Sequence, residues 1–249
     1  MKQYDFENII FRNNSGSHKW DEMLTVPGVE KDVIPFSVAD MELKNAPEII
    51  EGLKAYLDKS VLGYVKPNDA FRQVVADFIE RRHGWKIEKE WLKDSHGVVT
   101  AFFAAVTAFT EPGDGVILMT PIYFPMYMAA TLNNRKEVHN SLLLKGDHYE
   151  IDFEDLEAKA RDPKNKILIL CSPHNPTGRV WTVDELTRIG RICIDNNVLV
   201  VADEIHNDLI MPGYHHTMFG SISEEFAQHS ITLTSPSKTF NLAGMQVAN

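Results

Sequence analysis

Two charged residues of this sequence follow short, strongly apolar runs, where an isolated charge is costly. Asp203 comes directly after residues 198–202, and Lys238 lies four residues beyond the run 231–234. An aspartate at such a point can match the charge of a bound cation, and a lysine framed by small hydroxyl residues can attack an aldehyde as a nucleophile. Taken alone, each has an ordinary alternative: a helix N-cap for the aspartate and a solvated surface position for the lysine.

Further polar or aromatic groups lie beside other apolar runs. The loop 172–178 holds Asn175 between two prolines and a glycine, which makes a stiff, shaped turn. Tyr123 follows the run 116–119, and the small-residue turn at 97–100 precedes a helix whose first amides can hold an anion such as phosphate. Each of these also fits an ordinary turn or a packing ring when it is considered alone.

Apolar runs alternate with amphipathic segments along most of the chain. Helices are expected from Ala46, between a cap at Asn68 and a stop at Gly84, over 101–110, and after the capping box 182–185. Strands are expected to end or lie at 97–99, 116–119, 167–171, 198–202 and 231–234. Runs of Val, Ile and Leu between such helices predict a three-layer α/β/α protein with a mostly parallel sheet covered on both faces.

In sheets of this kind, chemistry gathers at the carboxyl ends of the strands. Phosphate donors, an aromatic ring, an amide, a carboxylate and a lysine follow the expected strands in that order along the chain. Asp203 would keep a pyridine nitrogen protonated, so that the ring acts as an electron sink, and Lys238 would hold an aldehyde. The set as a whole therefore predicts a site for pyridoxal 5′-phosphate.

Composition and charge exclude several other classes of protein. The 249 residues are 44% hydrophobic and 24% charged, as in an ordinary globular protein, and the formal net charge of −10 argues against nucleic-acid binding. The sequence has no P-loop, no GxGxxG motif and no spaced set of zinc ligands, so no metal site is expected. Its two cysteines form no CxxC pair, and it shows no signal peptide or membrane-spanning run; a cytoplasmic location without membrane contact is expected.

Longer motifs are spread over the whole chain. They are Lys19-Trp-Asp21, Val38-Ala-Asp-Met41, Gly63-Tyr64, Arg81-Arg-His-Gly-Trp85, Ala108-Phe-Thr-Glu-Pro-Gly-Asp114, Cys171-Ser-Pro-His-Asn-Pro-Thr-Gly-Arg-Val-Trp181, Asp203-Glu-Ile-His206 and Ser235-Pro-Ser-Lys-Thr-Phe-Asn-Leu-Ala-Gly244. Together they resemble the fold type I pyridoxal-phosphate enzymes of the aminotransferase class I and II family. More narrowly, they resemble its MalY/PatB branch of cystathionine β-lyases and C–S lyases.

The resemblance implies catalytic roles for three residues. Lys238 would bind the cofactor covalently and then move the proton on the substrate Cα, and Asp203 would pair with the pyridine nitrogen. Tyr64 would reach the phosphate of the cofactor in the partner subunit, which implies a homodimer with shared active sites.

The resemblance also implies which residues bind cofactor and substrate. Asn175 would bond the ring 3′-oxygen with His206 close by, and Tyr123 would stack on the ring. The amides of Val98 and Val99 and the hydroxyls of Ser235 and Ser237 would hold the phosphate. The substrate would lie near Val38, Ala39 and Asp40.

The activity that this resemblance implies is carbon–sulfur β-elimination, in which cystathionine or a cysteine-type substrate gives a thiol, pyruvate and ammonia. An aminotransferase using the same cofactor site is one alternative, and an inactive, truncated cofactor-binding protein is another. Gln246 stands eight residues after Lys238, where many aminotransferases carry a phosphate-binding Arg. Glutamine cannot make that bidentate, charged contact, and this favours the lyase.

The sequence also predicts a domain organisation. Residues 1–45 are expected to form an N-terminal arm and part of a small domain, and residues 46–249 the cofactor-binding large domain. The sequence stops at Asn249, soon after Lys238, whereas members of the family continue with a C-terminal small domain that supplies an Arg for the substrate carboxylate. The chain is therefore expected to be C-terminally truncated, with this small domain missing and the large domain incomplete.

Overall fold

The computed structural model describes residues 4–30 and 32–249, which divide into two compact units. One unit comprises the described residues within Met1–Lys66, together with Phe240–Ala243, and the other comprises Pro67–Thr239 and Gly244–Asn249. The assignment of residues 46–249 to a single cofactor-binding domain stays a prediction.

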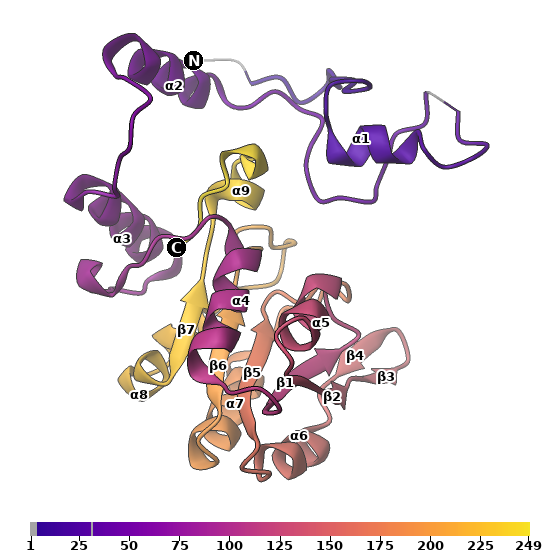
Figure 1. Cartoon of the computed structure of the whole chain (residues 1–249), viewed down its shortest axis with the longest axis vertical. Helices are drawn as coiled ribbons and strands as arrows, with labels where there is room; N and C mark the ends of the chain where they lie inside the picture. The colour runs from indigo at the N-terminus through magenta and orange to yellow at the C-terminus, as the bar shows by residue number, and fades with distance from the viewer. Residues whose placement is uncertain (1–3, 31) are drawn as a thin grey trace. The chain divides into compact units, whose positions relative to one another are not determined.

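The larger unit is built on a parallel sheet with the strand order β2-β1-β5-β6-β7 (Figure 1). Its strands are β1 (Gly115–Thr120), β2 (Lys136–Ser141), β5 (Asn165–Cys171), β6 (Leu199–Asp203) and β7 (Ser230–Leu233). A separate antiparallel pair is formed by β3 (Leu143–Lys145) and β4 (His148–Glu150). In the main sheet, Asp203 is in register with Cys171 on one side and Leu233 on the other, so three neighbouring strands end level.

Side chains of the sheet enter two hydrophobic cores, one on each face. Ile117 of β1 packs in a core with Leu156 of α6 (Phe153–Ala160) and Leu186 of α7 (Val183–Asp195). Its neighbour Leu118 packs in the other core with side chains from α4 (Val98–Phe109) and α5 (Phe124–Thr131). Because successive residues of a strand point to opposite faces, this alternation gives the three layers that the apolar runs predict.

Local sequence signals set the ends of several helices. Asn68 accepts the Phe71 backbone N–H (3.0 Å) at the start of α3 (Asp69–His83), and Gly84 ends it in the left-handed region at φ 68°. The expected capping box also opens α7. Along α3 the burial of apolar side chains differs, because Val74 is 67% exposed while Ile79 is 5% exposed. The remaining short elements are α8 (Glu224–Gln228), α9 (Pro236–Thr239), η1 (Lys89–Trp91), η2 (Phe219–Ser221) and η3 (Ala243–Met245).

The strand end expected at residues 97–99 is wrong. Gly97 has a φ of 92° and is the N-cap of α4, which begins at Val98 rather than at residue 101. A positive φ is open to glycine and interrupts an extended chain, so the apolar run that follows continues as helix from its first residue. Val98 and Val99 thus supply helix N-terminal amides.

The smaller unit contains α1 (His18–Met23), which the sequence did not reveal, and α2 (Pro47–Lys59), which begins close to the expected Ala46. Trp20 is fully buried and meets the Phe11 ring edge-on. Phe36 of the same unit is, by contrast, 94% exposed.

Two kinds of feature are absent from residues 4–30 and 32–249. No helix in this part of the chain is long and apolar enough to cross a bilayer. No group of three or more His, Cys, Asp and Glu side chains in the same residues is placed to hold a metal ion. Cys171 and Cys193 are both buried and free.

Candidate functional site

The predicted cofactor residues of the larger unit follow the carboxyl ends of its parallel strands. Asp203 is the last residue of β6, and Asn175 comes four residues after β5 ends. Tyr123 is the N-cap residue of α5, just after β1, and Lys238 lies in α9, just after β7. Helix α4 leads back into the start of β1, so its first turn lies towards the same carboxyl edge (Figure 1).

Asp203 is a buried carboxylate with few donors. Its side chain accepts a hydrogen bond from the Ile205 backbone N–H (3.1 Å), and the residue is only 4% exposed. Burial is the main cause that raises its pKa to about 7; the Ile205 N–H and the Lys238 ammonium lower it, and the neighbouring Glu204 raises it. This is the behaviour of a carboxylate in an apolar setting that a cation would stabilise.

Three further side chains interact electrostatically with Asp203 or with one another. The pKa of Tyr123 is raised by burial and by the charge of Asp203, and the pKa of His206 is lowered by burial and by the Lys238 ammonium. Lys238 in turn acts on Asp203. The structure therefore brings Tyr123, Asp203, His206 and Lys238 into one electrostatic cluster.

The loop that carries Asn175 is held by its own backbone. Its peptide bonds Ser172–Pro173 and Asn175–Pro176 are cis, and the Gly178 N–H donates to the His174 carbonyl (2.8 Å). The Asn175 backbone N–H donates to Cys171 Sγ (3.3 Å) at the end of β5. The Asn175 side chain is half-buried at this turn.

His174 ties this loop to the neighbouring strand, a role that the sequence did not reveal. Its Nε2 lies 3.1 Å from the Met119 carbonyl on β1, and its Nδ1 lies 2.9 Å from Thr177 Oγ1 in the loop. The ring is 2% exposed, and burial lowers its pKa to about 4. A neutral His174 therefore joins the loop that carries Asn175 to the strand that leads to Tyr123.

The expected phosphate donors differ in how far they are already used. Helix α4 has no side-chain cap and no acidic residue in its first turn, which leaves the amides of Val98 and Val99 suited to an anion. Ser235 Oγ donates to the Val247 carbonyl (2.7 Å), accepts the Ser237 N–H (3.0 Å) and lies 2.9 Å from Ser237 Oγ. The Ser235 hydroxyl thus already donates its hydrogen bond to a group of the chain itself. The amides at the start of α4 suit the predicted phosphate binding without such a change.

Four predicted residues belong to the smaller unit: Tyr64, Val38, Ala39 and Asp40. The Tyr64 side chain is fully exposed at 110%. The Asp40 carboxylate forms ion pairs with Arg12 (2.9 Å) and Lys19 (3.7 Å) of the same unit. Their roles in catalysis and substrate binding stay predictions.

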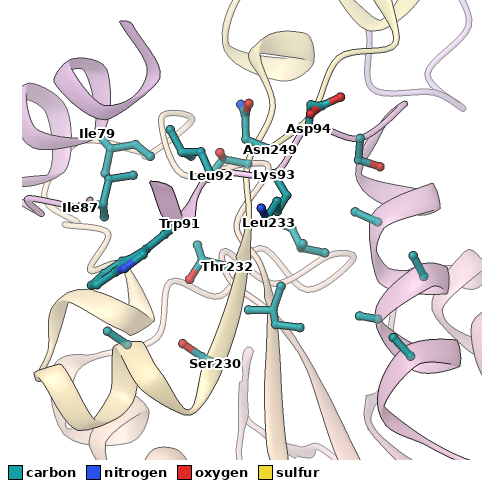
Figure 2. A pocket seen from close by; sticks show the side chains of 18 of the residues that line it. Ile79, Ile87, Trp91, Leu92, Lys93, Asp94, Ser230, Thr232, Leu233 and Asn249 are labelled. Atoms are coloured by element: carbon teal, nitrogen blue, oxygen red, sulfur yellow. The ribbon is translucent and has the colours of Figure 1, made fainter. Parts of the chain in front are cut away.

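An apolar groove of about 620 Å³ lies elsewhere on the larger unit, beside the edge strand β7 (Figure 2). Its lining includes Trp91 and Leu92 and, from β7, Ser230 and Thr232. None of the predicted site residues lines this groove. It is therefore distinct from the cluster at the carboxyl ends of the strands.

Comparison with known proteins identifies the family. The family model described as "Aminotransferase class I and II" matches residues 31–249. The chain belongs to this family. It is 46% identical to the protein named cystathionine beta-lyase PatB from Bacillus subtilis, over 98% of this chain and 63% of that protein.

Two solved structures that contain pyridoxal 5′-phosphate resemble this member of the aminotransferase class I and II family. Cystalysin from Treponema denticola, whose structure contains a pyridoxal 5′-phosphate cofactor, has a TM-score of 0.97 and 51% identity, over 100% of this chain and 63% of that one. The pyridoxal-phosphate-bound C–S lyase from Staphylococcus hominis has a TM-score of 0.90 and 30% identity, again over 100% and 63%. The chain thus spans about 63% of the length of these relatives.

Proposed function

We propose that this chain is the cofactor-binding part of a pyridoxal 5′-phosphate-dependent carbon–sulfur β-lyase, which cleaves cystathionine or cysteine-type substrates to a thiol, pyruvate and ammonia. The observation that carries the proposal is the buried carboxylate Asp203, whose pKa burial raises to about 7 and the Lys238 ammonium lowers in part. The names of the relatives at 46% and 51% identity support the choice of a lyase.

The residues at the strand ends fit this cofactor chemically. Asp203 would hold the proton on the pyridine nitrogen, and the resulting opposite charge would lower the raised pKa of the carboxyl. The unused amides at the start of α4 would bind the phosphate, together with Ser237 and, after reorientation of its hydroxyl, Ser235. The half-exposed Tyr123 ring would cover the cofactor ring, with Asn175 and His206 at its oxygen substituent.

When bound, the cofactor supplies an electron sink for the carbanion that proton removal creates at the substrate Cα. Lys238 would hold the cofactor through Nζ and, once a substrate amine has displaced it, would accept the Cα proton at the same atom. The ammonium of Lys238 lowers the pKa of the Asp203 carboxyl and the pKa of the His206 ring. The proposed base therefore belongs to the electrostatic cluster of Tyr123, Asp203, His206 and Lys238.

The proposal includes a homodimer with shared active sites in a cytoplasmic setting. Helix α2 has no buried residue, and Leu53 and Leu57 on it are 37% and 56% exposed. Such a helix suits a protein partner, and the exposed Tyr64 follows it in the chain. The two free, buried cysteines support a reducing compartment.

Incubation with pyridoxal 5′-phosphate, borohydride and peptide mass analysis tests the cofactor site. The expected result is covalent labelling of Lys238 in the parent chain and no label at that position in Lys238→Ala. A parent chain without label at Lys238 would overturn the cofactor assignment.

Pyruvate release from cystathionine tests the activity. We expect pyruvate in the absence of any keto acid, and none from Lys238→Ala. Product formation that requires a keto acid would instead support the aminotransferase alternative. Labelling at Lys238 without turnover of either kind would support a cofactor-binding chain that is inactive by itself.

A further inference from the structure

The turn that carries Lys238 is short and depends on side-chain contacts for its placement. Helix α9 covers only Pro236–Thr239, so it has almost no internal hydrogen bonding to fix its direction. Ser235 secures its beginning through the Val247 carbonyl (2.7 Å). Thr239 secures its end, because Thr239 Oγ1 donates to Asp208 Oδ2 (2.9 Å).

Asp208 is well suited to hold that end. Its side chain is 3% exposed, and it lies in the turn that follows β6 and the predicted Asp203. Its second oxygen, Oδ1, accepts from Arg82 Nε of α3 (3.0 Å) and lies 3.6 Å from His83 Nε2. One carboxylate thus joins three parts of the fold: α3, the turn after β6, and α9.

We propose that Asp208 is a positioning residue for Lys238, acting through the Thr239 hydroxyl. The inference rests on the proposed function, because it concerns the lysine that would hold the cofactor. Thr239 is the residue next to Lys238, and a hydrogen bond to a charged acceptor is stronger than one between neutral groups. Asp208 is itself bound by Arg82 from another element through its other oxygen, which fixes the direction in which its Oδ2 meets Thr239.

The position of Lys238 matters because covalent capture of an aldehyde needs a well-oriented amine. Loss of the Thr239 hydroxyl leaves the C-terminal end of α9 without its side-chain anchor. We expect the rate of capture at Lys238 to fall about tenfold, the effect of losing one hydrogen bond to a charged group. The ordinary structural alternative predicts lower stability with an unchanged rate of capture in the folded fraction.

The experiment measures the rate at which the folded chain captures pyridoxal 5′-phosphate at Lys238, by timed borohydride quenching and peptide mass analysis. Thr239→Val removes the hydroxyl at nearly constant shape, and Thr239→Ser restores it. Urea unfolding of each variant gives the folded fraction used to correct the rates. We expect slow capture by Thr239→Val and recovery to the parent rate in Thr239→Ser.

A double-mutant cycle connects the effect to Asp208. Asp208→Asn removes the charge of the acceptor and should slow capture, and adding Thr239→Val to it should slow capture less than in the parent, because both changes weaken the same hydrogen bond. Glu225→Gln is the matched control: it breaks the ion pair of Glu225 with Arg191 between α8 and α7, before β7 begins, and it should leave the rate unchanged.

Several outcomes separate the two proposals. Capture by Thr239→Val at the parent rate, or fully additive effects in the cycle, would overturn the positioning role while the cofactor site stands. Slow capture by Thr239→Val without recovery in Thr239→Ser would overturn it too. If Thr239→Val does not fold, the comparison of Asp208→Asn with the parent and Glu225→Gln decides: equal rates refute the role, and slow capture by Asp208→Asn alone supports it. Failure of the parent itself to label Lys238 would overturn the proposed function and this role together.

Discussion

The buried carboxyl of Asp203 is expected to reduce the stability of the cofactor-free protein as pH rises. Its pKa is raised from 3.8 to about 7 in the fold, mainly by burial. The folded state therefore binds the proton more tightly than the unfolded chain does. The stability this gives is complete below about pH 4 and is lost progressively as pH rises to about 7. At 1.36 kcal/mol per unit of pKa, the full loss is about 4 kcal/mol.

Asp203→Asn removes this titration while keeping a side-chain oxygen that can accept the Ile205 N–H. The variant should be more stable than the parent at about pH 8, by as much as the ~4 kcal/mol that ionisation costs. At about pH 5.5 the advantage should be smaller by about 2 kcal/mol. This pH lies about 1.5 units below the folded-state pKa, and the parent has not yet lost the stability that disappears over that interval. Urea unfolding of the cofactor-free chain at the two pH values measures both quantities.

Asp147→Asn is the control, since the Asp147 side chain is fully exposed; it should leave the pH dependence of unfolding as in the parent. The reasoning about Asp203 is refuted if Asp203→Asn is no more stable than the parent at the higher pH. A stability difference that stays the same at both pH values would refute it equally, because only a titrating group gives the slope. The same variant should capture pyridoxal 5′-phosphate poorly, so a gain in stability would accompany a loss of function.

Three further predictions concern stability. Burial lowers the pKa of His174 to about 4, so the folded state disfavours its proton and stability should fall by up to about 3 kcal/mol as pH drops from about 6.5 towards 4; His174→Gln should remove that slope in urea unfolding. A Cβ at Gly190 would lie 2.3 Å from the Phe226 ring, so Gly190→Ala should destabilise by about 1–3 kcal/mol. Its control Gly52→Ala meets no atom within 4 Å in α2 and should stabilise by up to about 1 kcal/mol; thermal unfolding measures both. Thr182→Ala removes the capping box of α7 and should cost about 1 kcal/mol in the same assay, and no change would show that the cap contributes nothing.

The sequence predicted what depends on neighbours in the chain. The caps at Asn68 and Thr182 are properties of four consecutive residues, and both are confirmed. The strand ending at Asp203 was predictable because an unbroken apolar run stops at a charge. Burial of single side chains was less predictable: Val74 and Ile79 are both apolar residues of α3, but Val74 is exposed and Ile79 is buried. They lie five residues apart, on different sides of the helix, and which side is covered is set by residues far away in the chain.

The supporting residues escaped prediction for the same reason. His174 bonds the carbonyl of a residue 55 positions away, and Arg82 bonds Asp208 across 126 positions. Neither contact leaves a local pattern. The predicted strand end at 97–99 was wrong for a different reason. The apolar run that follows Gly97 fits either a strand or a helix, and the positive φ of Gly97 decides for the helix.

Asp203 and Asp208 show what the structure adds to the sequence at this site. Both are buried carboxylates, five positions apart in one segment; the sequence marks Asp203, which ends an apolar run, and indicates no role for Asp208. The structure surrounds Asp208 with Arg82, His83 and the Thr239 hydroxyl, so its charge is satisfied within the fold. Asp203 receives one backbone N–H and has a raised pKa. A carboxylate that the fold itself satisfies can position other groups, whereas one that the fold leaves poorly stabilised gains most from a bound cation. The difference in donors therefore supports the proposed positioning role of Asp208 and the proposed ligand-binding role of Asp203.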